Sequence, residues 1–182
     1  APAPALCEGR EPAPMSAYTL TIEHVLKHPV RDIHPIAWSL FYHMRYAAHP
    51  VPDAVLYAMM IRACAAGVPQ PNTMPLRRKR TMEADAERAL DLFREMTVHH
   101  GVRPNKEVYD SLILTCARRK DHSADALRLL HELVEGDHTR LWPDAYTYNA
   151  VLQGSARHGA LTTARWILAA IVRSGRADER RL

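Results

Sequence analysis

The feature that most constrains the fold is a short apolar pattern that recurs four times along the chain. An alanine is followed by apolar residues three, four and seven positions later in residues 37–44, 89–96, 126–133 and 164–171. Residues at these intervals fall on one face of an α-helix, which makes one turn about every 3.6 residues. The pattern therefore predicts four amphipathic helices of one kind.

A proline followed by Asp or Asn separates the first three of these helices from another helical segment. The pairs are Pro52–Asp53, Pro104–Asn105 and Pro143–Asp144. Proline disfavours continuation of a helix, and a short Asp or Asn side chain caps the first turn of a new one. The segments that follow share a tyrosine, an aliphatic residue, and then Cys or Ser beside Ala. The matched positions are Tyr57, Tyr109 and Tyr148; Ile61, Ile113 and Leu152; Cys64, Cys116 and Ser155; and Ala65, Ala117 and Ala156.

These matched residues are interpreted as packing positions. Small residues side by side let two helices approach closely, so Cys64 and Cys116 are expected to be buried and unreactive. A tyrosine that recurs at one repeat position is expected to pack between helices, with its hydroxyl bonded at the edge. The alternative, in which the tyrosines stack on the rings of a ligand, stays open.

The repeating unit is then a helix, a turn, a second antiparallel helix and a Pro-Asp turn. We expect units at about residues 16–53, 54–105 with a surface loop inserted at 67–82, 106–144 and 145–175. A flexible Pro-rich arm at 1–15 and a basic tail at 176–182 flank them. Hairpins of this kind bury their apolar faces by stacking on their neighbours. The predicted fold is all-α, a solenoid of antiparallel helix pairs.

Composition and motifs argue against several classes of protein. The net charge is only +4, which permits an acidic partner such as RNA without requiring one. The three cysteines form no CxxC pair, and His24 and His28 lack a third ligand nearby, so we expect no metal and no cofactor. No apolar run is long enough to cross a bilayer, and no nucleotide loop or nucleophile motif occurs. We therefore expect no enzymatic activity, no membrane partner and no small-molecule substrate. The start at Ala1 fits a processed form or a fragment.

Residues 143–175 resemble a known repeat. Their sequence, PDAYTYNAVLQGSARHGALTTARWILAAIVRSG, is similar to the pentatricopeptide repeat in its TYNAVL start, its glycine turn, its central alanine and its closing basic-Ser-Gly. Residues 101–118, GVRPNKEVYDSLILTCAR, carry the same signature, and the resemblance covers most of residues 37–175. It implies a right-handed superhelix that binds single-stranded RNA in an organelle, with one repeat for each base.

The resemblance also implies candidate RNA-binding residues. In the family, the fifth residue of the first helix and the last residue of the repeat read a base together, and a basic residue near position thirteen meets a phosphate. The base-reading positions in this sequence are Ala58 with Asn105, Asp110 with Asp144, and Asn149 with Asp178 or Glu179. Of these, only Asn149 is a usual base reader. The phosphate positions are Arg118 and Arg157.

Each of these assignments has a competing interpretation that needs no ligand. Asn105 and Asp144 follow prolines, so helix capping explains them without RNA, and we favour it. The basic residues 118–120 end a predicted helix, where cations also complement the helix dipole. The densest basic patch is either a phosphate contact or a solvated loop. It consists of Arg77, Arg78, Lys79 and Arg80.

The resemblance sets the expected function. About three repeats would cover about three bases, too few for tight sequence-specific binding. We therefore expect a non-catalytic RNA-associated adaptor of mitochondrial gene expression, located in the matrix. The leading context is a mitochondrial ribosome component or assembly factor in contact with rRNA and ribosomal proteins. The alternatives are a protein–protein scaffold of another organelle complex without RNA contact, and a fragment of an mRNA-specific stability or translation factor.

Overall fold

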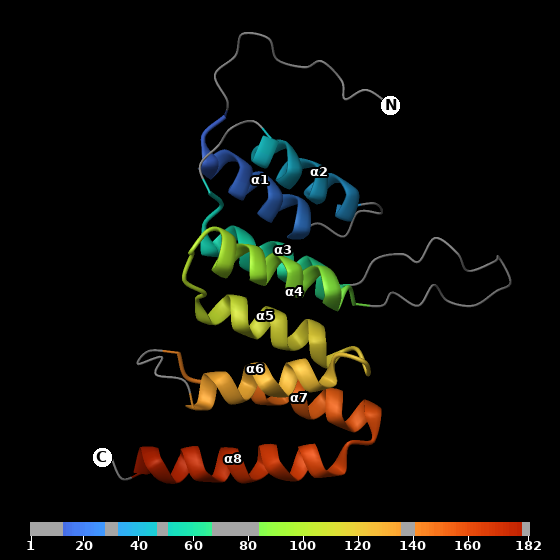
Figure 1. Ribbon diagram of the computed structural model, residues 1–182, viewed down its shortest axis with the longest axis vertical. Coiled ribbons are helices and arrows are strands. Elements are labelled where there is room, and N and C mark those ends of the chain that lie inside the picture. Colours follow the sequence, from blue (N-terminus) through green and yellow to red (C-terminus); the bar gives the residue numbers. More distant parts are fainter. Residues whose placement is uncertain (1–12, 28–32, 47–50, 67–83, 136–140, 180–182) are drawn as a thin grey trace, which may run out of the picture. The chain divides into compact units, whose positions relative to one another are not determined.

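The computed structural model describes residues 13–27, 33–46, 51–66, 84–135 and 141–179, and every regular element in these ranges is helical (Figure 1). The prediction of an all-α fold is confirmed for this part of the chain. By its internal contacts the chain divides into two compact units, Ala1–Pro52 and Asp53–Leu182. None of the described helices is both long and apolar enough to span a membrane.

The first unit contains one helix pair, α1 (Met15–Lys27) and α2 (Ile33–Tyr46), which pack against each other. Ile22 of α1 and Phe41 of α2 are fully buried. The hydroxyl oxygen of Tyr18 lies 3.0 Å from Nδ1 of His43, so a hydrogen bond also joins the two helices.

The second unit contains three further helix pairs. Its elements are α3 (Ala54–Ala66), α4 (Ala86–Arg94) with a π-helical turn η1 (Glu95–His99), α5 (Lys106–Ala117), α6 (Ser123–Glu135), α7 (Ala145–His158) and α8 (Leu161–Glu179). Helix α5 packs against both α3 and α7, so the first helices of the three pairs form a row (Figure 1). Each second helix, α4, α6 or α8, packs against the first helix of its own pair.

The residues after the prolines cap the first helices, as the sequence predicts. Asp53 Oδ1 accepts a hydrogen bond from the Leu56 amide at 2.8 Å, and Asn105 Oδ1 accepts one from the Val108 amide at 2.9 Å. Asp144 Oδ1 accepts from the Thr147 amide at 3.0 Å, and the Thr147 hydroxyl accepts from the Asp144 amide, which completes a capping box. Capping is therefore confirmed at all three positions.

The matched tyrosines and cysteines are packing residues. Tyr57, Tyr109 and Tyr148 are all buried. The Tyr57 hydroxyl donates to Glu95 Oε1 at 2.9 Å, and the Tyr109 hydroxyl donates to Glu132 Oε1 at 2.8 Å, so both bonds join the two helices of a pair. Cys64 and Cys116 are buried, which raises the pKa of both thiols to about 12. The packing interpretation of both residue types is confirmed.

Two glycines of the last pair have structural reasons. A β-carbon at Gly154 of α7 would lie 2.5 Å from the carbonyl oxygen and 3.0 Å from the β-carbon of Ala117 at the end of α5. These two helices therefore approach each other through their backbones. Gly159 ends α7 with φ at 71°, in the left-handed region that favours glycine.

The structure also departs from the expected boundaries. Helix α8 continues to Glu179, so residues 176–179 of the expected basic tail are helical. Gly175 does not end the helix because the residues after it favour helix and no proline follows. The inserted loop at 67–82 and residues 1–12 of the arm lie outside the described residues.

Candidate nucleic-acid interface

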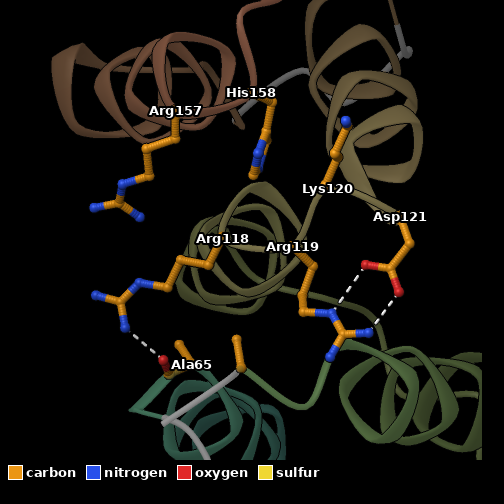
Figure 2. A pocket seen from close by; sticks show the side chains of 8 residues that line it. Ala65, Arg118, Arg119, Lys120, Asp121, Arg157 and His158 are labelled. Atoms are coloured by element: carbon orange, nitrogen blue, oxygen red, sulfur yellow. Dashed lines mark hydrogen bonds and ion pairs between the residues drawn. The ribbon is translucent and has the colours of Figure 1, made fainter. Parts of the chain in front are cut away.

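An open cleft of about 930 Å³ lies at the carboxyl ends of the first helices in the second unit. Figure 2 shows the cationic side chains that surround it, together with Ala65 and Asp121. The cationic lining residues are Arg118, Arg119 and Lys120 after α5, and Arg157 and His158 at the end of α7. Two consecutive first helices thus place their basic ends around one cavity.

The fold fixes two of these side chains on the carbonyl groups of the preceding first helix. The Arg118 guanidinium donates a hydrogen bond to the Ala65 carbonyl oxygen near the end of α3 (Figure 2). His158 Nε2 lies 3.3 Å from the Ala117 carbonyl oxygen at the end of α5. Because a carbonyl oxygen only accepts, Nε2 carries the hydrogen in this bond. Both contacts place a basic group at the partially negative carboxyl end of a helix.

One cation of the cleft is neutralised within the chain. Arg119 donates to both carboxylate oxygens of Asp121, at 2.9 Å and 2.5 Å. This bidentate bond lowers the pKa of Asp121 to about 2, so the carboxylate stays charged at neutral pH. Arg119 is therefore a poor candidate for binding an additional anion.

The other two cations of the cleft lack such a counterion. Lys120 and Arg157 are exposed, and neither has an acidic partner among the described residues. Arg118 keeps its full positive charge, since its only described hydrogen bond is to a neutral carbonyl. The cleft thus offers the charges of Arg118, Lys120 and Arg157 to an anion of extended shape. A phosphate backbone has this chemistry.

The predicted base-reading pair Asp110 and Asp144 is brought together, but around a lysine of the chain. Lys106 Nζ lies 2.5 Å from Asp110 Oδ2 and 2.8 Å from Asp144 Oδ2. The Thr147 hydroxyl donates to Asp110 Oδ1 at 2.5 Å. The bonds to Lys106 and to the Thr147 amide lower the pKa of Asp144 to about 2. The cluster links α5 to α7 and occupies both carboxylates.

Sequence reasoning missed Lys106 in this cluster. Its spacing of four residues from Asp110 is a recognisable helical ion-pair signal. The approach of Asp144 from the following pair has no local signal, because it depends on how α7 packs on α5.

The remaining predicted residues lie in different surroundings. The Ala58 side chain is buried in α3, where a base has no access to it. Asn149 is exposed on α7. The patch from Arg77 to Arg80 and the side chains of Asp178 and Glu179 lie outside what the structure describes. No cluster of metal-ligating side chains occurs among the described residues.

Comparison with known proteins gives two relatives of stated function. The chain is 32% identical over 131 residues to the mitochondrial 15S rRNA processing factor CCM1 of Yarrowia lipolytica, which covers 71% of the chain and 14% of that protein. It is 28% identical over 133 residues to the CCM1 protein of Candida tropicalis, described in the same words, covering 72% of the chain and 15% of that protein. The chain thus spans about a seventh of the length of either relative. No protein-family model matches it.

Proposed function

We propose that the chain is a short solenoid of pentatricopeptide type that binds single-stranded RNA as a non-catalytic adaptor of mitochondrial gene expression. Its place is the mitochondrial matrix, in contact with rRNA and with ribosomal or assembly proteins. Support for the cellular context comes from the two relatives, both described as mitochondrial 15S rRNA processing factors. Support for the solenoid comes from the row formed by α3, α5 and α7.

The observation that carries the RNA proposal is the cleft with the free charges of Arg118, Lys120 and Arg157. Its cations come from matched ends of successive first helices, so they face a linear polyanion at repeated intervals. Flexible phosphate chains are bound by such grooves with little dependence on sequence.

The RNA proposal is tested by removing the two cations without an acidic partner. Lys120→Ala with Arg157→Ala should lower affinity for a fluorescent single-stranded RNA about tenfold at low salt, since two phosphate contacts are lost. Fluorescence anisotropy of the purified chain measures this affinity. The matched control is Arg94→Ala with Arg128→Ala, which removes the same charge from the second helices, where each arginine pairs with a nearby aspartate.

Equal losses in the two double variants would show that net charge, and not the cleft, governs binding. Absence of RNA binding at low salt would reject the RNA proposal. It would favour a second candidate function, a protein–protein scaffold without RNA contact. One observation supports that candidate already: the Asp110 and Asp144 carboxylates are occupied by Lys106 and are not available to a base.

A further inference from the structure

The second unit covers the same flank of its first two helix pairs with the next pair. Thr115 of α5 lies against α3, where its hydroxyl is 3.4 Å from the Ile61 carbonyl oxygen. Gly154 of α7 lies against Ala117 of α5. At the matched aliphatic position, Ile61 and Ile113 are both fully buried. A first helix with a short residue therefore seats on this flank twice.

The same flank of α7 is uncovered. Leu152 matches Ile61 and Ile113 but is only partly buried. Ala156 matches Ala65 and Ala117, which are both buried, yet it is exposed. Because Gly154 faces α5, and Ala156 lies about 200° further around the helix, this flank points away from α5.

Helix α8 continues the uncovered surface. Trp166 stacks on His131 of α6, with ring centroids 5.8 Å apart and planes 15° from parallel, so it marks the side of α8 that faces the preceding pair. Leu168 lies about 200° around the helix from Trp166. It is 54% exposed, whereas its counterpart Leu130 on α6 is 0% exposed. Leu161 and Val172 lie on the same stripe and are 77% and 54% exposed.

We infer that this surface, formed by Leu152, Ala156, Leu161, Leu168 and Val172, docks an antiparallel helix pair of a partner protein. The first helix of the partner presents a short residue to Ala156, as Gly154 does to Ala117. Its second helix packs apolar side chains on Leu168. The surface is apolar and its shape is the one that the chain itself fills at two earlier positions, which defines the chemistry of the occupant.

A second copy of the chain does not supply this occupant. The short residues that would seat on Ala156 are Ala63, Thr115 and Gly154, and all three are already buried. In the first unit, Tyr18 bonds across its helix pair as Tyr57 does, which makes His24 the counterpart of Ala63. His24 is exposed but too large for this contact. The occupant is therefore a different protein.

The test uses a fluorescent synthetic peptide of residues 143–173 as the probe, since its Gly154 face is free in isolation. The full chain should bind the peptide saturably in an anisotropy titration. Ala156→Glu and Leu168→Asp in the chain should each weaken binding at least about tenfold, because each buries an unpaired carboxylate. Thr162→Asp, on an exposed part of α8 off the stripe, is the matched control and should change affinity little.

Three outcomes overturn the inference. The first is absence of saturable binding. The second is binding that Ala156→Glu and Leu168→Asp leave unchanged, which would place the peptide on the α5–α6 flank by displacement of α7. The third is self-association of the chain in sedimentation that Leu168→Asp abolishes, which would make a second copy the occupant. The variants keep Arg118, Lys120 and Arg157, so RNA affinity reports separately on the proposed function.

Discussion

At the scale of single residues, Gly154 decides how closely two helices pack. It lies inside α7, where alanine would normally be preferred by about 1 kcal/mol because glycine costs more backbone entropy. The nearest atoms to an added β-carbon belong to the Ala117 backbone and not to a side chain that could rotate away. The contact and the helix propensity thus act in opposite directions at one position.

We predict that Gly154→Ala destabilises the chain by about 1–3 kcal/mol, despite the gain in helix propensity, because α7 must move away from α5. Urea unfolding followed by circular dichroism measures the change. Gln153→Ala is the control, since Gln153 is exposed on the same helix and should change stability little. A stabilised Gly154→Ala variant would mean that the backbones are not in contact.

Lys106 shows at the same scale how a plausible binding residue becomes structural. Asp110 and Asp144 were candidate base readers, but both carboxylates bond to Lys106. The bonds to Asp110 and Asp144 raise the pKa of Lys106 against the smaller opposing tendency of the ion pair to be desolvated as a whole. One basic residue four positions from Asp110 therefore changes what the pair of acids can do.

At the scale of elements, the beginning of α7 depends on a charge as well as on a cap. The pKa of Asp144 is lowered from its ordinary value near 3.8 to about 2, first by Lys106 and then by the Thr147 amide. A carboxylate with a lowered pKa stabilises the fold above its unfolded-state pKa. That stabilisation is lost as the pH falls from about 4 towards 2.

We predict that Asp144→Asn lowers stability by about 0.5–1 kcal/mol at about pH 6, because Asn keeps the cap but loses the exposed ion pair. The difference from the parent chain should shrink as the pH falls towards 2, since Asp144 is then protonated in the parent too. Urea unfolding across this range is the measurement. Asp91→Asn, at a more exposed ion pair on α4, should show a smaller effect. A gap that stays constant with pH would contradict the charge argument.

The sequence predicted elements better than it predicted the interface. The prolines, their Asp or Asn neighbours and the recurring apolar stripe are local signals, and they located capped helices correctly. The packing role of Tyr109 and Cys116 followed from matched positions. The carbonyl contacts of Arg118 and His158 could not be predicted, because each reaches a helix distant in sequence. The π-helical turn at Glu95–His99 had no sequence signal that we recognise.

At the scale of the whole molecule, the modest net charge makes the placement of cations more important than their number. With a net charge of +4, long-range attraction of RNA is weak at physiological salt. Binding through the cleft must then depend on a few local phosphate contacts. Each such contact releases counterions and contributes a measurable salt dependence.

We predict that the logarithm of RNA affinity falls linearly with the logarithm of salt concentration. Lys120→Ala with Arg157→Ala should make this slope shallower by about 1.4, because single-stranded RNA contributes about 0.7 for each phosphate contact. Anisotropy titrations over a series of salt concentrations give both slopes. An unchanged slope would show that these two side chains do not meet phosphates.

The glycine at position 154 also has a consequence for the spacing of charges. Because α5 and α7 touch through main-chain atoms, no side-chain cushion sets the interval between their carboxyl ends, where Arg118 and Arg157 are attached. The backbone thus acts as a ruler for the cations. Side chains elsewhere in the two helices can drift over evolutionary time, and the pitch that the pair of arginines offers to a polyanion stays the same.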